Sequence, residues 1–197
     1  MEANKWHRNF DDLKPYLKDK KVLDVGAAAG SNILPFCGKG SKGLDRKPGA
    51  PNIIKGDATS FELGEKFDVV TMCSIIEHLP SKEHVRSAFR QAHKHLRDDG
   101  LIIVQCPHAF DTGAWYEFEH ELALTHHSVM QGLESVGFRI EGAWTHLRLP
   151  FDQAYVQRFG VVKLPISSDY IVKLLATANM ARDVVVVGRK AGKGTRK

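Results

Sequence analysis

The stretch VLDVGAAAGSN, residues 22–32, decides the fold of this chain. The apolar segment VLDV predicts a buried strand, and the small residues after it predict a turn that leads into a helix. Gly26 permits a sharp turn, and Gly30 permits close approach of the backbone at the helix start. Asp45 follows 19 residues after Gly26, about one β-unit later. This arrangement is typical of a site for a nucleoside-bearing cofactor.

Ala28 narrows the choice of cofactor. A dinucleotide-binding turn has a glycine at this place, where the backbone touches the pyrophosphate. The chain has Ala28 at this place, and its turn lacks the lysine that phosphate-binding loops contain. The turn therefore favours a nucleoside without phosphates. A turn of small residues that serves only packing is the alternative.

Acidic residues lie at the ends of three successive predicted strands. Asp24, Asp45 and Asp57 belong to strands at 21–25, 41–44 and 52–55. Ligands of open α/β sheets bind at the carboxyl ends of the strands, so the three acids together support a binding site. Asp45 could accept hydrogen bonds from two ribose hydroxyls, and Asp57 could meet an adenine edge. Taken singly, each acid could equally be a turn or cap residue.

The rest of the chain alternates between strand and helix patterns. Further strands are expected at 67–73, 101–106, 138–146 and 183–188, and helices at 4–19, 31–38, 82–96, 125–136 and 168–179. Ser81 and Thr125 are the expected caps of two of these helices. Apolar runs separated by helical patterns indicate a parallel sheet that is buried on both faces.

The ordered motifs resemble those of the class I S-adenosylmethionine-dependent methyltransferases, especially the small-molecule "type 11" group. The resemblance rests on VLDVGAAAG, GLD, GDAT, FDVVTMCSIIEHLP and LRDDGLIIV, within about residues 20–106, and continues more weakly in LESVGFRI and DVVVVGRK. The first motif is DxGxAxG here, where the family usually has DxGxGxG. The resemblance implies one Rossmann-like α/β domain over residues 1–189. Its seven-stranded, mostly parallel sheet would have the order 3-2-1-4-5-7-6, with helices on both faces.

The resemblance also implies S-adenosylmethionine as cofactor and assigns residues to it. Gly26 and Gly30 would line the methionine portion, Asp24 would orient that loop, Asp45 would bind the ribose and Asp57 the adenine amino group. The full set of expected cofactor-binding residues is Asp24, Gly26, Ala27, Gly30, Asp45, Arg46, Asp57, Ala58, Cys73 and Ser74.

Histidines are the candidates for a general base, since histidine transfers protons near neutral pH. His120, His78 and His108 are the expected catalytic residues. Each could instead be a structural histidine. A metal site from Cys73, Cys106, His108 and His78 is not expected, because no ligand spacing supports it.

The acceptor pocket is expected in two segments with aromatic side chains, residues 108–124 and 148–165, the second within a probable acceptor-side insertion at 148–182. Aromatic walls suit a small organic acceptor, methylated on oxygen or nitrogen. An apolar cluster or a dimer contact is the alternative for these aromatics.

For the function, the alternatives are an RNA methyltransferase, prompted by the isoelectric point of 9.1, and a non-catalytic S-adenosylmethionine-binding protein. The strand after LRDDG ends in Gln105-Cys106-Pro107, without the lysine that the 2′-O-ribose methyltransferases have there.

Composition places limits on partners. The net charge of +5 comes from the basic end of the chain at 189–197, and residues 190–197 are expected to be a disordered tail. Nucleic acid is therefore an unlikely partner, although it is not excluded. No apolar run reaches the roughly 20 residues that cross a membrane, so a cytoplasmic protein, monomer or homodimer, is expected. The three cysteines are expected to be free thiols.

Overall fold

The computed structural model describes residues 10–28, 30–111, 118–146, 163–165 and 183–192. Its strands are β1 (Val22–Val25), β2 (Lys42–Asp45), β3 (Ile53–Lys55), β4 (Phe67–Cys73), β5 (Leu96–Pro107), β6 (Phe138–His146), β7 (Lys163–Pro165) and β8 (Asp183–Lys190). Its helices are α1 (Lys14–Leu17), α2 (Lys82–His95) and α3 (His126–Glu134), together with the short 3₁₀ helices η1 (Leu34–Phe36) and η2 (Ile76–His78).

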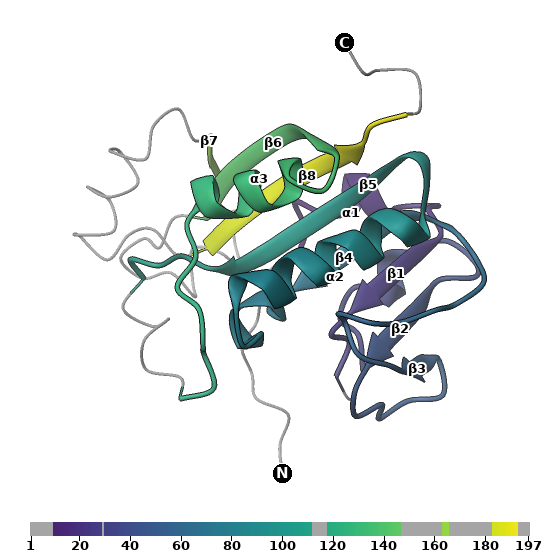
Figure 1. Cartoon of the computed structure of the whole chain (residues 1–197). Helices are drawn as coiled ribbons and strands as arrows, with labels where there is room; N and C mark the ends of the chain where they lie inside the picture. Colours follow the sequence, from purple (N-terminus) through teal and green to yellow (C-terminus); the bar gives the residue numbers. More distant parts are fainter. Residues whose placement is uncertain (1–9, 29, 112–117, 147–162, 166–182, 193–197) are drawn as a thin grey trace, which may run out of the picture.

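The strands form one sheet in the order β3-β2-β1-β4-β5-β8-β6-β7 (Figure 1). The first five strands in this order are parallel, and β8 is antiparallel to both β5 and β6. β8 is the seventh of the expected strands and β6 the sixth, so the expected order 3-2-1-4-5-7-6 is confirmed. The short strand β7, which was not expected, pairs antiparallel with β6 and extends the sheet beyond it.

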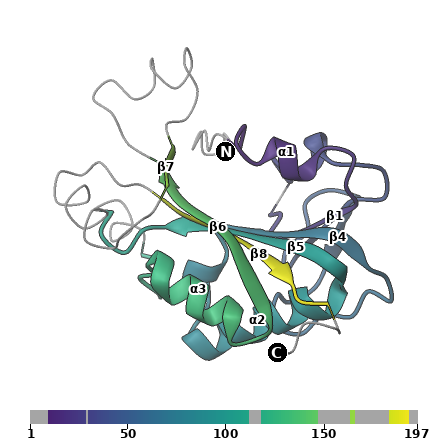
Figure 2. The same cartoon turned by 90° about the horizontal axis from the view of Figure 1, so that it is seen from above.

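Helices cover both faces of the sheet, as expected. Figure 2 shows α2 and α3 on one side of the sheet and α1 on the other. The larger core cluster, which contains Phe67 and Phe89, packs beneath α2 and α3, and a second cluster packs Leu13 and Leu17 of the α1 region onto the opposite face. All four residues of β1 are buried, which explains why the strand is uniformly apolar apart from one acid.

Two expected helices start where their caps were predicted. Ser81 accepts a hydrogen bond from the backbone N–H of His84 at the start of α2, and Thr125 accepts one from Ser128 at the start of α3. Each cap satisfies a backbone donor that the first turn of a helix leaves without a partner. α2 ends at His95, and the chain passes directly into β5, which begins at Leu96 rather than at the expected Leu101.

The expected helix at 31–38 is wrong, since this segment contains only the three residues of η1. The Ser31 hydroxyl accepts hydrogen bonds from the N–H groups of Ile33 and Leu34, both at 3.0 Å. Pro35 has no N–H to donate to a helical turn. Two residues after the end of η1, the N–H of Gly38 donates to the carbonyl of Lys20, just before β1, at 2.7 Å. The segment is too short for a longer helix.

At the chain ends, the described residues modify the expected boundaries. The N-terminal helix expected at 4–19 comprises only Lys14–Leu17 within the described residues, and Lys190 is the last residue of β8 rather than the first of a tail. The expected helix at 168–179 and most of the insertion lie outside the described residues. All three cysteines are free thiols, as expected. No helix in the described part of the chain is long and apolar enough to span a bilayer.

Candidate functional site

A pocket lies at the carboxyl ends of β1, β2, β3 and β4, where open α/β sheets bind ligands. It is lined by Gly26, Leu44, Asp45, Arg46, Gly56, Asp57, Ala58, Ile75, His78 and Leu79. Half of the expected cofactor-binding residues are in this lining, from three different strand ends, and so is one of the expected catalytic histidines. The apolar members form walls, and the two aspartates supply hydrogen-bond acceptors.

Gly26 makes the turn that opens the pocket. Its φ is +85°, a conformation that residues with a side chain rarely adopt. A Cβ at this position would lie 2.9 Å from the Cβ of Ile75 on the facing wall. The N–H groups of Gly26 and Ala27 both donate to the Leu44 carbonyl, at 2.8 and 3.2 Å. The turn is therefore fastened to β2, and only glycine fits at its tightest point.

Asp45 is held in place by the backbone on either side of the pocket. One carboxylate oxygen accepts from the N–H of Ala28 at 2.8 Å, and the other accepts from the N–H of Lys47 at 2.7 Å. Ala28 has a φ of +50°, so it adopts the left-handed conformation that glycine would adopt more easily. A carboxylate has about four acceptor positions. Asp45 can therefore accept further hydrogen bonds while its orientation is fixed.

Asp57 is arranged in a similar way at the end of β3. Its Oδ1 accepts from both the N–H and the hydroxyl of Thr59, at 2.8 and 2.6 Å. These hydrogen bonds, the hydroxyl's first, lower the pKa of Asp57, so the carboxylate is ionised at neutral pH. Because both donors bond to Oδ1, Oδ2 is the oxygen through which Asp57 can accept from a ligand.

Asp24 lies beneath the pocket instead of lining it. It is 5% exposed, and its two carboxylate oxygens accept from the hydroxyls of Thr71 and Ser31, at 2.7 and 2.5 Å. The Ser31 hydroxyl in turn accepts from the N–H groups of Ile33 and Leu34, so Asp24 links β1, β4 and the loop after Gly26. That Asp24 orients this loop for a cofactor, or contacts a ligand directly, stays a prediction.

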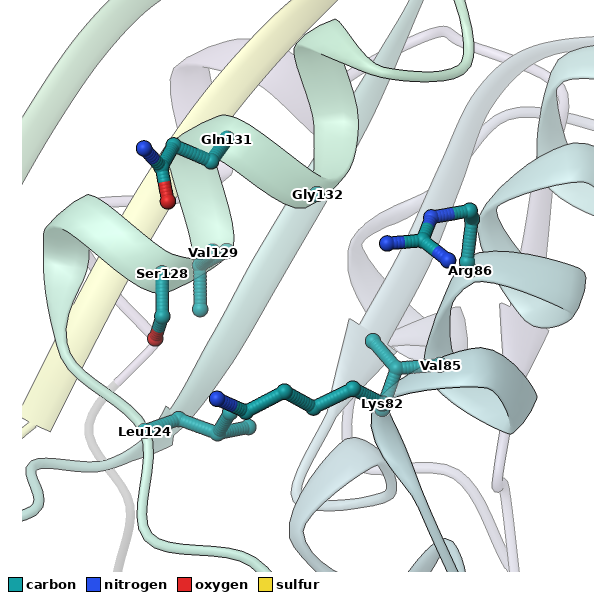
Figure 3. A pocket seen from close by; sticks show the side chains of 8 residues that line it. All are labelled: Lys82, Val85, Arg86, Leu124, Ser128, Val129, Gln131 and Gly132. Atoms are coloured by element: carbon teal, nitrogen blue, oxygen red, sulfur yellow. The ribbon is translucent and has the colours of Figure 1, made fainter.

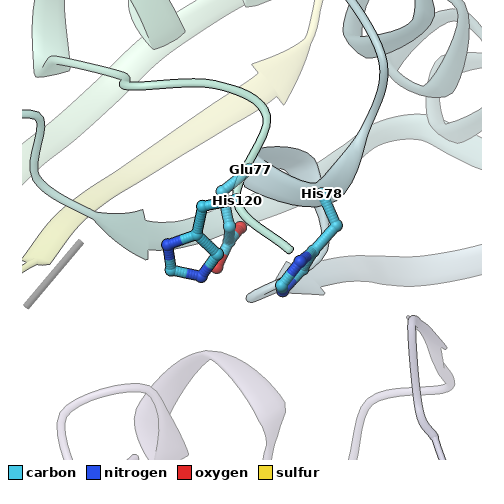
Figure 4. Close-up of side chains that lie close together, drawn as sticks. All are labelled: Glu77, His78 and His120. Atoms are coloured by element: carbon cyan, nitrogen blue, oxygen red, sulfur yellow. The ribbon is translucent and has the colours of Figure 1, made fainter. Parts of the chain in front are cut away.

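The structure brings His78 and His120 together, with ring centroids 4.8 Å apart. Figure 4 shows that these two rings and the side chain of Glu77 point to the same side of η2. His108, the third expected catalytic residue, lies elsewhere. It is 2% exposed, its Nδ1 accepts from the N–H of Phe110, and its ring packs 5.3 Å from that of His126. His108 therefore has the surroundings of a structural histidine.

The family model described as a methyltransferase domain matches residues 2–160. The chain belongs to this methyltransferase family. A search of curated protein sequences finds no match. Among solved structures, the methyltransferase is similar to an S-adenosylmethionine-dependent methyltransferase from Archaeoglobus fulgidus, with a TM-score of 0.68, 17% identity, and coverage of 92% of this chain and 91% of that chain.

Two further solved structures resemble the methyltransferase in fold. A possible histamine N-methyltransferase from Thermotoga maritima has a TM-score of 0.67 and 16% identity, covering 92% of this chain and 86% of that one. The N-methyltransferase NodS from Bradyrhizobium japonicum, in complex with S-adenosylhomocysteine, has a TM-score of 0.63 and 15% identity, covering 96% and 89%. At these identities the likeness establishes the fold of the methyltransferase.

The remaining expected cofactor residues of the methyltransferase lie close to the pocket but outside the lining just described. Gly30 faces open space, since nothing lies within 4 Å of the Cβ it lacks, whereas the methyl group of Ala27 packs against Gly43. Cys73 and Ser74 follow at the end of β4, where Ser74 has a φ of +56°. Contact of these four residues with a cofactor stays a prediction.

Sequence reasoning did not single out the apolar walls or the acid beside the histidines. Leu44, Ile75 and Leu79 line the pocket, but in the sequence they cannot be distinguished from core residues. Glu77 is buried, at 1% exposure, although acidic residues are rarely buried. The only available signal was its position directly before His78 at a strand end.

A second hollow lies between α2 and α3, lined by Lys82, Val85, Arg86, Leu124, Ser128, Val129, Gln131 and Gly132 (Figure 3). Its charged side chains are Lys82 and Arg86, and the described lining contains no acid to accept hydrogen bonds from ribose hydroxyls. The pocket at the strand ends therefore remains the candidate site of the methyltransferase.

Asp24 gives the loop a testable dependence on pH. Burial raises its pKa to about 6 from an ordinary value of 3.8, against the lowering effect of the Ser31 and Thr71 hydrogen bonds. Because the folded-state pKa is the higher one, the stability that the protonated carboxyl contributes is complete below pH 3.8 and is lost as the pH rises through about 6. Between pH 3.8 and about 6, we expect the free energy of unfolding of wild type to fall by on the order of 1–3 kcal/mol relative to that of Asp24→Asn. Urea unfolding of both proteins at several pH values measures the difference, and a constant difference would contradict it.

Proposed function

We propose that this methyltransferase transfers a methyl group from S-adenosylmethionine to an oxygen or nitrogen atom of a small-molecule acceptor. One observation carries the proposal: Asp45 and Asp57 present oriented carboxylates at neighbouring strand ends, in one pocket with apolar walls. Two hydroxyls of a ribose and the amino group of an adenine are donors, and the pocket offers acceptors at both places. Because residue 26 has no side chain, Ile75 can pack closely against the turn and form the wall of the pocket.

The residues that would hold the cofactor follow from this geometry. Asp45 would accept from the ribose hydroxyls, and Oδ2 of Asp57 would accept from the adenine amino group. Leu44, Ile75 and Leu79 would pack against the adenine ring and exclude water from it. When bound, S-adenosylmethionine supplies an already activated methyl group on a positively charged sulfur. The chain therefore has to orient the acceptor and handle its proton.

The acceptor would bind on the side of the pocket where His78 and His120 meet. His78 is part of the pocket lining, and His120 belongs to the segment after β5 that contains exposed aromatic side chains. Phe110 is 44% exposed and Phe118 is fully exposed, so both rings are available to cover an organic acceptor. The likeness to the Thermotoga protein, a possible histamine N-methyltransferase, also favours an acceptor of small size. The aromatic residues expected at 148–165 lie outside the described residues.

A labelled-methyl transfer screen tests the proposal. The full chain would be incubated with S-adenosylmethionine labelled in the methyl group and with separate pools of small metabolites and of RNA. We expect label to appear in the metabolite pool. Label in the RNA pool alone would support the RNA methyltransferase instead. Binding of S-adenosylmethionine without transfer to either pool would support a non-catalytic binding protein.

A further inference from the structure

Glu77, His78 and His120 form a cluster of metal-binding side chains beside the cofactor pocket. One ligand atom from each residue lies within 4.8 Å of the other two. Glu77 and His78 come from η2, whereas His120 comes from the segment after β5, 42 residues further along the chain (Figure 4). A carboxylate with two imidazoles is a common ligand set for divalent transition metals.

Backbone hydrogen bonds fasten the two segments together at this cluster. The carbonyl of Glu77 accepts from the N–H groups of Glu121 and Leu122, at 2.9 and 3.1 Å. The two residues that follow His120 are therefore bonded directly to η2. Main-chain contacts therefore hold the backbone of the two segments that carry the three side chains in place before a ligand binds.

His78 has the partner that orients a metal-binding histidine. Its Nδ1 lies 3.0 Å from the carbonyl oxygen of Glu119. Because a carbonyl only accepts, Nδ1 carries the proton, and the neutral ring keeps its lone pair on Nε2. Metal-binding histidines usually donate their second N–H in this way, which fixes both tautomer and orientation. His78 can thus offer Nε2 to a cation.

The ligand atoms of the cluster have to approach one another when an ion binds. Metal–nitrogen and metal–oxygen bonds in such sites are about 2.0–2.2 Å long, so two ligand atoms of a tetrahedral ion lie about 3.4 Å apart. The ligand atoms of the cluster lie within 4.8 Å of one another, so its widest pair has to close by up to about 1.4 Å. Rotation of the half-buried His120 side chain provides this movement, while Glu77, at 1% exposure, is the fixed member. A buried carboxylate is also favourable beside a cation.

We propose that Glu77, His78 and His120 bind a divalent transition-metal ion at the edge of the cofactor pocket, and that this ion holds an oxygen of the acceptor. The role of the ion rests on the proposed function, whereas the binding of the ion does not. Three protein ligands leave coordination positions open, as catalytic metal sites do. His78 and His120 then act as ligands, in place of the general base that the sequence suggested.

The ion would supply what a general base otherwise supplies. A hydroxyl bound to a divalent metal loses its proton near neutral pH, and the proton passes to water. The oxygen lone pair then forms the new bond to the methyl carbon, and the electron pair of the broken carbon–sulfur bond remains on sulfur. No oxidant or reductant is required. The acceptor class that fits the site is therefore a compound with a hydroxyl group, best with a second oxygen that can share the metal.

Metal binding can be measured without any turnover. Full-length protein freed of metal with EDTA would be titrated with Co²⁺, followed by visible absorbance and calorimetry. We expect one equivalent to bind to wild type, and Glu77→Gln and His120→Ala to weaken binding at least about 100-fold, since loss of an orienting partner alone costs about 10- to 100-fold. His127→Ala, which removes an exposed histidine of α3, is the matched control and should bind as wild type does.

S-adenosylmethionine binding to the same proteins separates this proposal from the proposed function. His120 is not in the described pocket lining, so His120→Ala should bind the cofactor normally; it also serves if Glu77→Gln does not fold. Absence of saturable Co²⁺ binding in wild type, or equal binding in His120→Ala and His127→Ala, overturns the metal site. Co²⁺ binding without cofactor binding would instead overturn the proposed function. With a hydroxyl acceptor, EDTA should lower transfer about 100-fold or more, and added Mn²⁺ should restore it.

Discussion

Replacing Asp45 with asparagine is expected to weaken binding of S-adenosylmethionine by at least about 100-fold. The substitution removes the negative charge and one of the two acceptor oxygens that would face a bound ribose. Hydrogen bonds to a charged group contribute about 1.5–3 kcal/mol each, and 1.4 kcal/mol corresponds to a factor of ten. Losing most of two such bonds therefore costs about two orders of magnitude. Isothermal titration calorimetry with S-adenosylmethionine measures the effect directly.

Asp19→Asn is the matched control for this prediction. Asp19 is an exposed turn residue with a φ of +60°, a conformation that asparagine also adopts readily. It lies before β1, outside the pocket lining, so the same change of charge and shape should leave the affinity unchanged. Equal affinities of Asp45→Asn and Asp19→Asn would mean that Asp45 does not hold the ribose. A thermal unfolding curve of each variant separates a lost contact from a lost fold.

The part of the site that could be predicted from sequence is the part built from strand ends. Asp45 and Asp57 follow buried apolar segments, and in a parallel sheet the ends of all such segments meet at one edge. Their meeting in one pocket with Gly26 follows from that rule, because the strand order places β1, β2 and β3 side by side. Local chain direction is sufficient information for these residues.

The pairing of His120 with Glu77 could not be predicted in the same way. His120 is not on a strand or helix, and its position depends on the two backbone hydrogen bonds from residues 121 and 122 to the Glu77 carbonyl. Such bonds are independent of residue type, so they leave no pattern in the sequence. His108 shows the same limit of sequence reasoning: its place after β5 suggested catalysis, whereas its burial and the packing of its ring with His126 depend on tertiary contacts that the sequence pattern does not reveal.

Local hydrogen bonds explain why the helix expected at residues 31–38 does not form. Ser31 lies at an expected helix start, and its hydroxyl does accept from backbone N–H groups as a cap does. The same hydroxyl also donates to Asp24, which ties the cap to β1. With Pro35 in the following turn and Gly38 already bonded to Lys20, only η1 can form. The start of the helical segment was predicted to within a few residues, and its length was not.

Gly26→Ala is expected to lower both stability and cofactor affinity. Alanine at a φ of +85° costs about 1–3 kcal/mol, and its Cβ would lie 2.9 Å from the Cβ of Ile75, so the pocket wall has to move.

Gly64→Ala is the matched control: its φ is +65°, and nothing lies within 4 Å of an added Cβ. Gly64→Ala should show the loss of stability alone, about 2–4 °C in melting temperature for each kcal/mol. Gly26→Ala should lose at least as much stability and should also bind S-adenosylmethionine at least tenfold more weakly. A factor of ten corresponds to a loss of about 1.4 kcal/mol of binding free energy, which we expect from the displaced wall. Equal cofactor affinities in the two variants would show that Ile75 and the turn at Gly26 do not shape the cofactor site.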